Sequence, residues 1–261
     1  MYEREPANYG ILVQLVRSFL IVAWFCCCCT CIVVAQVVGL PLYVIKKEYF
    51  NTWIALTKES FGLAITALTE WSAPTPVRIS GDRSVLGQVT LTSNGGIKTN
   101  FPERLVLIAN HQVYTDWLYL WWVTYTNKMH GHIYIILKES LKYIPLVGQG
   151  MTLYGFIFMA RKWMADKPRL QHRLSKLSIK RGQSASGNPL FDPMWLLIFP
   201  EGTNLSLHTK QVSDAYGEKK GIPPLKHELH PRSTGLYFCL QQLRGSVQYV
   251  YDCTMAYEGP P

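Results

Sequence analysis

Charged residues are scarce in this sequence, and one segment has none at all. Only 16% of the 261 residues are Asp, Glu, Lys or Arg, against about 25% in typical soluble domains. From Ser18 to Ile45 the chain carries no charge and no histidine. That run exceeds the roughly 20 residues that cross a bilayer and is longer than a signal-peptide core. We therefore expect an N-terminal tail at 1–17 and an uncleaved transmembrane helix at 18–45, kinked or ended near Gly39-Leu40-Pro41.

Several patterns that define other protein classes are also absent. All of the seven cysteines except Cys239 and Cys253 lie inside the apolar run, so they form no disulfide framework and no paired zinc motif. The lack of a Gly-x-Ser-x-Gly motif argues against a serine nucleophile on a strand-to-helix elbow. Two pairs of histidines lack a carboxylate or cysteine at a convincing spacing, so we expect no metal site: His130 with His132, and His227 with His230.

The segment after the apolar run has the pattern of an amphipathic helix. Phe50, Ile54, Phe61, Ile65 and Leu68 recur at helical spacing, with charged residues between them. The pattern predicts a helix at 46–72 that either lies on a bilayer surface or packs against a folded domain. The proline-rich stretch at 72–76 ends this helix.

From Val77 onwards, strand-like and helix-like runs alternate. Alternation of this kind predicts an α/β domain at 77–261, with a central mixed sheet flanked by helices. The expected strands are 77–79, 88–92, 104–109, 132–137, 153–159, 194–199 and 247–251. The expected helices are 116–128, 139–144, 166–181, 208–219 and 233–243, and 182–193 is expected to be a loop.

The polar segment 110–116 lies between the expected strand at 104–109 and a helix that starts near Thr115-Asp116. Within this segment His111 and Asp116 are five residues apart, which on a regular helix would place them about 140° apart. They can meet only if His111 lies in the loop and Asp116 in the first helical turn. The carboxylate would then hold one ring nitrogen and leave the other to accept a proton. The residues alone leave open a loop histidine and a capping aspartate.

Two further strand ends carry polar groups. After the apolar run 195–198 the turn at 199–204 offers a carboxylate, a hydroxyl and Gly202, which permits close approach to a ligand, although ordinary turns have the same composition. Arg161 follows the run 155–160, where a guanidinium suits a phosphate. A surface arginine is the alternative interpretation.

Together these stretches resemble the membrane-bound glycerolipid acyltransferases, which include the lysophosphatidic acid acyltransferases. The resemblance covers about Arg104 to the end of the chain. Three motifs of that family match in order and spacing: Asn-His-x-x-x-x-Asp at Asn110, His111 and Asp116; Gly-x-x-Phe-x-x-Arg at Gly155, Phe158 and Arg161; and Phe-Pro-Glu-Gly-Thr-Arg from Phe199 to Thr203, departing at Asn204. Segments 136–145, 230–235 and 251–257 are similar to the lysophosphatidylinositol and lysocardiolipin acyltransferases. Because such proteins carry a further C-terminal region, we expect a fragment or a short form.

The resemblance implies acyl transfer from acyl-CoA, as co-substrate, to a lysophospholipid hydroxyl of the lysophosphatidylinositol or lysophosphatidate type. It implies no cofactor, no metal, and a place in membrane lipid metabolism, with the endoplasmic reticulum as the expected membrane. The alternative is a non-catalytic lipid-binding or scaffolding protein that keeps the fold. His111 would be the general base and Asp116 its orienting partner. The family motifs imply an acceptor site, to which we add Lys138 as a second cation because position 204 is not arginine. The expected acceptor-site residues are Asn110, Lys138, Arg161, Glu201, Gly202 and Thr203.

The chain has a net charge of +9, and some of its basic residues form a stripe on one expected helix. In the expected helix 166–181, Arg169, Arg173 and Lys176 follow helical spacing beside an apolar stripe that includes Leu170 and Leu174. This pattern suits an anionic membrane surface, the phosphates of CoA, or a solvated helix face. The predicted membrane helix and the lack of a recognisable binding module argue against nucleic acid as the partner.

Overall fold

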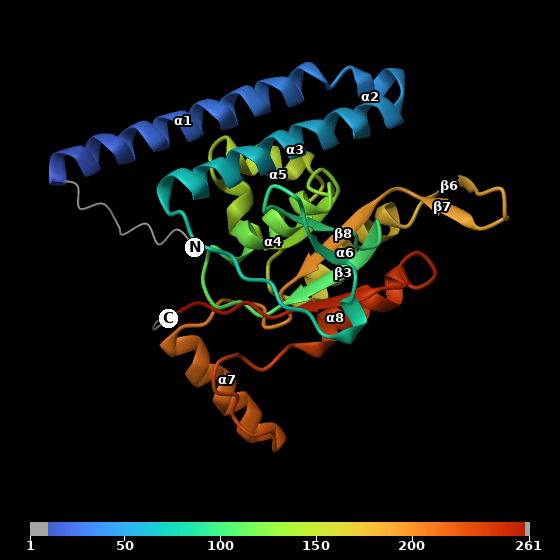
Figure 1. The fold of residues 1–261 in the computed structure, drawn as a ribbon. Coiled ribbons are helices and arrows are strands. Elements are labelled where there is room, and N and C mark those ends of the chain that lie inside the picture. The colour runs from blue at the N-terminus through green and yellow to red at the C-terminus, as the bar shows by residue number, and fades with distance from the viewer. Residues whose placement is uncertain (1–9, 259–261) are drawn as a thin grey trace. The chain divides into compact units, whose positions relative to one another are not determined.

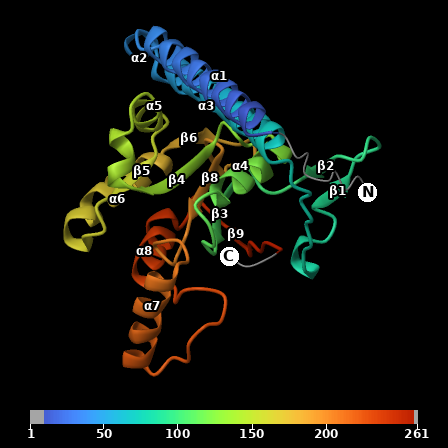
Figure 2. The same ribbon diagram turned by 90° about the vertical axis from the view of Figure 1, so that its left-hand side faces the viewer.

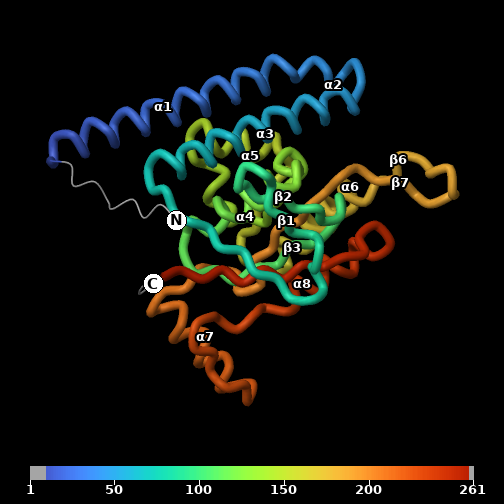
Figure 3. Tube along the Cα trace, in the orientation of Figure 1, coloured from blue at the N-terminus to red at the C-terminus, as the bar shows by residue number. Residues whose placement is uncertain are grey.

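The chain divides into two compact units, Met1–Ser80 and Gly81–Pro261. The computed structural model describes residues 10–258, and Figures 1 and 3 trace their course.

The first unit is a helical hairpin. Its helices are α1 (Ile11–Val38), the short α2 (Leu42–Ile45) and α3 (Lys47–Ser72). Figures 1 and 2 both show α1 and α3 side by side, and the Trp53 indole N–H donates to the Ala35 carbonyl at 2.8 Å. The predicted break at Gly39 is confirmed, and a Cβ there would lie 2.1 Å from the Trp53 ring, so only glycine fits. The span 11–45 is long and apolar enough to cross a membrane.

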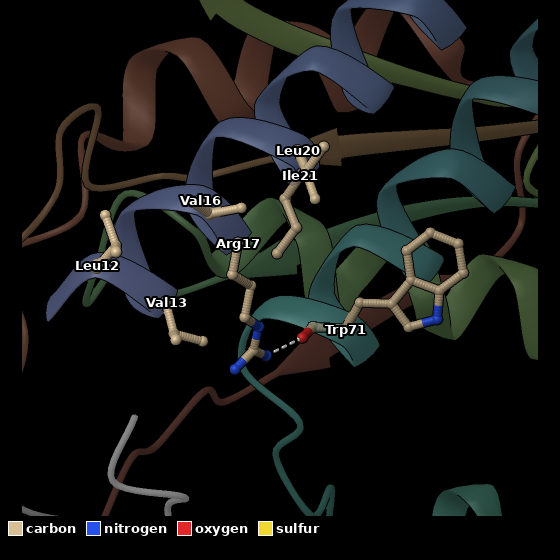
Figure 4. Close-up of a pocket in the computed structure, with 7 residues that line it drawn as sticks. All are labelled: Leu12, Val13, Val16, Arg17, Leu20, Ile21 and Trp71. Atoms are coloured by element: carbon tan, nitrogen blue, oxygen red, sulfur yellow. Dashed lines mark hydrogen bonds between the residues drawn. The ribbon is translucent and has the colours of Figure 1, made fainter. Parts of the chain in front are cut away.

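The first helix begins earlier than the sequence predicted. We expected it to start at Ser18, because Arg17 bounds the uncharged run, yet α1 continues through Arg17 to Ile11. The Arg17 guanidinium donates to the carbonyl of Trp71, in the last turn of α3 (Figure 4). Carbonyls in a last turn have no partner inside their own helix. Arg17 therefore supplies a hydrogen-bond donor to a free carbonyl at the end of α3 while it remains inside α1.

The second unit contains a five-stranded sheet in the order β5-β4-β8-β3-β9. Every neighbouring pair is parallel, so the α/β class is confirmed but the sheet is not mixed as expected. Parallel neighbours need long crossover connections, and the helices between the strands supply them. The strands are β3 (Arg104–Ala109), β4 (Ile133–Lys138), β5 (Ile157–Met159), β8 (Met194–Ile198) and β9 (Val250–Cys253).

The direction of each crossover decides which face its helix covers. The connections β3-to-β4 and β4-to-β5 run one way along the sheet, whereas β5-to-β8 and β8-to-β9 run the other way. Right-handed crossovers therefore place α4 and α5 on one face and α6 and α8 on the other. The core bears this out for α6 and α8, because Leu170, Leu174 and Cys239 pack with Val106 and Leu196 of the sheet. The helices are α4 (Asp116–Thr126), α5 (Val147–Leu153), α6 (Trp163–Leu177), α7 (Leu207–Lys220) and α8 (Ser233–Leu243).

The same packing corrects the interpretation of the basic stripe. Leu170 and Leu174 are 1% and 0% exposed, so the apolar stripe of α6 fills the protein core and does not face a bilayer. In the adjoining basic stripe, Arg169 and Lys176 are exposed and Arg173 is half-buried.

Some expected elements differ from the structure. Residues 77–79 form no strand. The expected strand at 153–159 starts only at Ile157, because α5 extends to Leu153 and a turn follows it at 154–155. The expected loop at 182–193 contains part of a hairpin, β6 (Lys180–Gln183) with β7 (Pro189–Phe191). Its strands are mostly exposed, so they lack the apolar alternation that reveals a buried strand. The expected helix at 139–144 is instead a short 3-10 helix, η2 (Glu139–Tyr143). Nearer the start of this unit lie a second 3-10 helix, η1 (Arg83–Val85), and a separate hairpin of β1 (Val89–Leu91) with β2 (Ile97–Thr99).

Candidate active site

The central strand β8 and its neighbour β3 end at the point in the sheet where the direction of the crossover connections reverses. The chain leaves β3 through α4 on one face, and it leaves β8 towards α8 on the other. Ligands of open parallel sheets bind at such a switch point, beyond the carboxyl ends of the strands. Ile108 pairs with Ile198, so three residues later His111 and Glu201 are level with each other. The register thus joins two motifs that lie far apart in the sequence.

His111 and Asp116 meet as their spacing required. His111 lies in the loop after β3, and Asp116 is the first residue of α4. The Nδ1 of His111 lies 2.9 Å from Oδ2 of Asp116, whose side chain is fully buried while that of His111 is 18% exposed. The same oxygen accepts the Val113 N–H at 3.1 Å. A carboxylate can only accept, so Nδ1 carries the proton and Nε2 is the proton-accepting nitrogen.

The imidazole is also held from the side of β8. The Phe199 ring stacks on His111 with centroids 4.2 Å apart and planes inclined by 23°. The Leu205 N–H donates to the His111 carbonyl at 2.7 Å. The ring orientation therefore depends on the turn after β8 as well as on Asp116.

Glu201 is a buried carboxyl group directly beside the histidine. Its Oε1 accepts the His111 backbone N–H at 3.3 Å, and the residue is 6% exposed. Its Oε2 is buried without a hydrogen-bond partner among residues 10–258. Burial raises the pKa of Glu201 from 4.5 to about 7, against the lowering effect of the His111 N–H, and the charge of Glu228 adds to the rise. Such a group can change its protonation near neutral pH, and it has an oxygen available for a ligand.

The chain after β9 returns to the site and reaches both ends of the 110–116 segment. The Tyr257 hydroxyl donates to Oδ1 of Asp116 at 2.5 Å. The Asn110 side chain forms two bonds with the backbone of Met255, donating to its carbonyl at 3.0 Å and accepting its N–H at 2.6 Å. We expected Asn110 to contact the substrate, but the structure uses it to hold this C-terminal segment. Tyr257 was missed, because nothing local in segment 251–257 reveals a partner so far upstream.

Arg161 and Lys138 do not join the His111 cluster. Both are exposed, at or just after the carboxyl ends of β5 and β4. Three strand intervals separate β5 from β3, or about 14 Å at the usual spacing. Arg161 has φ +63°, a left-handed conformation that is uncommon outside glycine. Buried Asp166 holds it there by accepting the N–H groups of the residues on both sides, Ala160 at 2.8 Å and Lys162 at 2.9 Å.

The turn at 201–203 has a cation that the sequence did not single out. Gly202 has φ +75°, which favours glycine, and a Cβ there would lie 3.6 Å from Cδ of Arg232. The Arg232 backbone is tied to the same turn, because its N–H donates to the Pro200 carbonyl at 2.8 Å. Neighbouring Thr203 is partly buried. The departure from the family motif at Asn204 is the one signal that a cation from elsewhere should be sought.

A histidine oriented by a buried aspartate, at the switch point of a parallel sheet, is the arrangement that an enzyme with a general base requires. Comparisons with known proteins agree with this class. The acyltransferase family model matches residues 94–258, which include all the site residues described above. The chain belongs to this family of glycerolipid acyltransferases.

Relatives with functional names include several lysophospholipid acyltransferases. The chain is 39% identical over 245 residues to an uncharacterized acyltransferase of Schizosaccharomyces pombe, covering 94% of this chain and 67% of the relative. It is 38% identical over 229 residues to the 2-acyl-1-lysophosphatidylinositol acyltransferase of Saccharomyces cerevisiae, covering 78% of this chain and 58% of the relative. It is 36% identical over 176 residues to lysocardiolipin acyltransferase 1 of Danio rerio, covering 66% and 42%. No solved structure matches significantly.

Proposed function

We propose that the protein transfers an acyl group from acyl-CoA to a hydroxyl of a lysophospholipid, of the lysophosphatidylinositol or lysophosphatidate type. The observation that carries this proposal is the His111–Asp116 bond of 2.9 Å at the switch point, in a chain of the acyltransferase family. The named relatives support the acceptor class, since one acts on lysophosphatidylinositol and others on lysocardiolipin.

The geometry supports a direct transfer. His111 takes the hydroxyl proton of the acceptor at Nε2 while the oxygen attacks the thioester carbonyl. The imidazolium that forms is stabilised by Asp116, which is buried against it. When the tetrahedral intermediate collapses, the carbon–sulfur bond breaks, and the leaving thiolate takes the proton from His111. The products are the ester and free CoA, and the histidine returns to its starting state.

The acceptor needs a cation for its phosphate and a partner for its remaining polar groups. Glu201 offers its buried Oε2 beside His111, and we assign it to the acceptor's polar groups at the reacting end. Gly202 and Thr203 form the turn along which the acceptor lies. Arg161, with Lys138 on the next strand, is the proposed phosphate contact, and Arg232 beside Gly202 is its competitor.

A lipid acceptor requires access to a membrane. The apolar span 11–45 supports a membrane-anchored enzyme, and the exposed basic face of α6 suits an anionic lipid surface. The endoplasmic reticulum, where phospholipid synthesis is concentrated, is the proposed membrane.

The test is a thiol-release assay on purified protein in mixed micelles, with acyl-CoA and a panel of lysophosphatidylinositol, lysophosphatidate and lysocardiolipin. Wild-type protein should release CoA with at least one of these acceptors, and His111→Ala should reduce kcat by at least a hundredfold, the scale of general-base catalysis. His172→Ala, which removes an exposed histidine of α6, is the matched control and should retain full activity. Wild-type protein that releases no thiol with any acceptor would favour the non-catalytic alternative, and an active His111→Ala would exclude this residue as the base.

A further inference from the structure

We propose that Tyr257 is a positioning residue of the catalytic pair, which fixes the carboxylate of Asp116 and through it the ring of His111. Its hydroxyl donates to Oδ1 of Asp116 at 2.5 Å, while Oδ2 of the same carboxylate receives His111 and the Val113 N–H. The kinetic part of this inference rests on the proposed function.

The Asp116 carboxylate needs such a partner on chemical grounds. The residue is 0% exposed, so water cannot satisfy its second oxygen. A buried carboxylate with one oxygen unpaired would carry a large desolvation cost and would be held on one side only. Donors on both oxygens fix the plane of the carboxylate, and that plane sets the direction in which His111 Nδ1 must point.

The surroundings of Tyr257 suit a permanent donor. Burial, followed by the hydrogen bond to Asp116 and the charge of that residue, raises the pKa of Tyr257 far above its usual value, so the hydroxyl keeps its proton. The ring makes an edge contact with Tyr119 of α4, with centroids 5.9 Å apart. Two residues before it, Met255 is held by both bonds of Asn110. Contacts of the Tyr257 ring and of the nearby backbone therefore hold the hydroxyl close to Asp116.

The structure also provides a matched control for the loss of one phenolic hydroxyl. Tyr251, in β9 of the same unit, donates to Oε1 of Gln88 at 2.6 Å and forms no hydrogen bond with the catalytic pair among residues 10–258. Tyr257→Phe and Tyr251→Phe each remove one short hydrogen bond from the same end of the chain. Only the first alters the environment of His111.

The first measurement is kinetic, on full-length protein in mixed micelles with the acceptor that gives the highest thiol release. Tyr257→Phe should lower kcat roughly tenfold with little change in either KM, since it weakens positioning and not binding. This loss is far below the ~10⁴-fold that removing the aspartate's function costs in a hydrolytic triad. Tyr251→Phe should keep the wild-type kcat. In an Asp116→Asn background, Tyr257→Phe should cause almost no further loss, because its effect passes through that carboxylate.

The second measurement does not depend on acyl transfer. Diethyl pyrocarbonate modifies unprotonated histidine, and peptide mass spectrometry reports the rate at His111 alone. At pH 8 this rate should rise about two- to fivefold in Tyr257→Phe, since the carboxylate charge is no longer shared with the phenol and the ring moves more freely. Tyr251→Phe should match the wild type.

The outcomes separate the two hypotheses. Wild-type protein without thiol release contradicts the proposed function, while the modification rate still tests Tyr257. An unchanged His111 modification rate in Tyr257→Phe overturns the positioning role, whatever the activity. Equal losses of kcat and of Tm in the two Tyr→Phe variants would also overturn it, because they would show a general structural effect.

Discussion

Glu201→Gln should make the protein more stable at alkaline pH while changing its stability little at acidic pH. Glutamine has the shape of the protonated glutamate, and its Oε1 can keep the 3.3 Å bond with the His111 N–H. The substitution therefore removes the charge of a residue that is 6% exposed without opening a cavity. It isolates the cost of burying the carboxylate.

The size and the pH range of the effect follow from the pKa of this group. Burial raises it from 4.5 to about 7. Each unit is worth about 1.4 kcal/mol, so the full cost of the buried charge is about 3 kcal/mol. Between these two pH values the folded protein binds more protons than the unfolded chain, so stability falls as pH rises. The penalty is absent below about pH 4.5 and complete above about pH 7, which leaves about 2–3 kcal/mol between pH 5 and pH 8.

The assay is thermal unfolding in a non-ionic detergent, followed by tryptophan fluorescence at pH 5 and pH 8. The Tm difference between Glu201→Gln and wild type should grow by roughly 5–10 °C between the two pH values, at 2–4 °C per kcal/mol for a unit of this size. Glu218→Gln removes an exposed carboxylate of α7 and is the control. Its Tm should track the wild type at both pH values. Parallel pH profiles for Glu201→Gln and wild type would refute the claim that the Glu201 carboxylate is destabilised by burial.

Three further predictions concern the acceptor site and the membrane. Arg161→Lys should raise the KM for the lysophospholipid roughly ten- to a hundredfold with little change for acyl-CoA, since one bidentate contact is worth about 1.5–3 kcal/mol; a selective rise for acyl-CoA would move Arg161 to the CoA phosphates. Asp166→Asn should raise the KM for the lysophospholipid several-fold while kcat is kept, because it loosens the left-handed backbone at Arg161; an unchanged KM would show that Asp166 does not position Arg161 for the acceptor. Deleting residues 1–45 should leave binding to anionic vesicles that disappears at high salt, because surface charges are screened over about 8–10 Å; sedimentation that ignores salt would contradict an electrostatic attachment.

The parts of the site that the sequence predicts are the local ones. The strand before His111 and the helix that begins at Asp116 both have clear patterns, and the spacing of five leaves one geometry in which the side chains meet. The break at Gly39 and the bounds of α3 also follow from short-range signals, namely proline, glycine and helical periodicity.

The parts that the sequence could not give depend on contacts between distant segments. Glu201 reaches the His111 backbone because β3 and β8 pair in a particular register, which neither strand encodes alone. Tyr257 meets Asp116 only because β9 adds to the sheet beside β3. Arg17 is a further example, in the first unit. The sequence predicted that this charge marks the start of the helix, but a carbonyl of the later helix α3 accepts a hydrogen bond from it inside α1.

The width of the sheet limits which cation can serve which substrate. In the proposed reaction the acceptor hydroxyl lies at His111, beyond β3, and in a lysophospholipid the phosphate is only a few bonds away from that hydroxyl. Arg232 lies beside the turn that follows β8, the neighbouring strand, so a phosphate there needs little reach. Arg161 lies about 14 Å across the sheet, so it can hold the same phosphate only if the acceptor lies over β4, where Lys138 would join it. Comparing Arg232→Gln with Arg161→Lys therefore locates the head group. The variant with the larger rise in the KM for the lysophospholipid identifies the cation that binds the phosphate. If both variants keep the wild-type KM, the phosphate binds at neither cation.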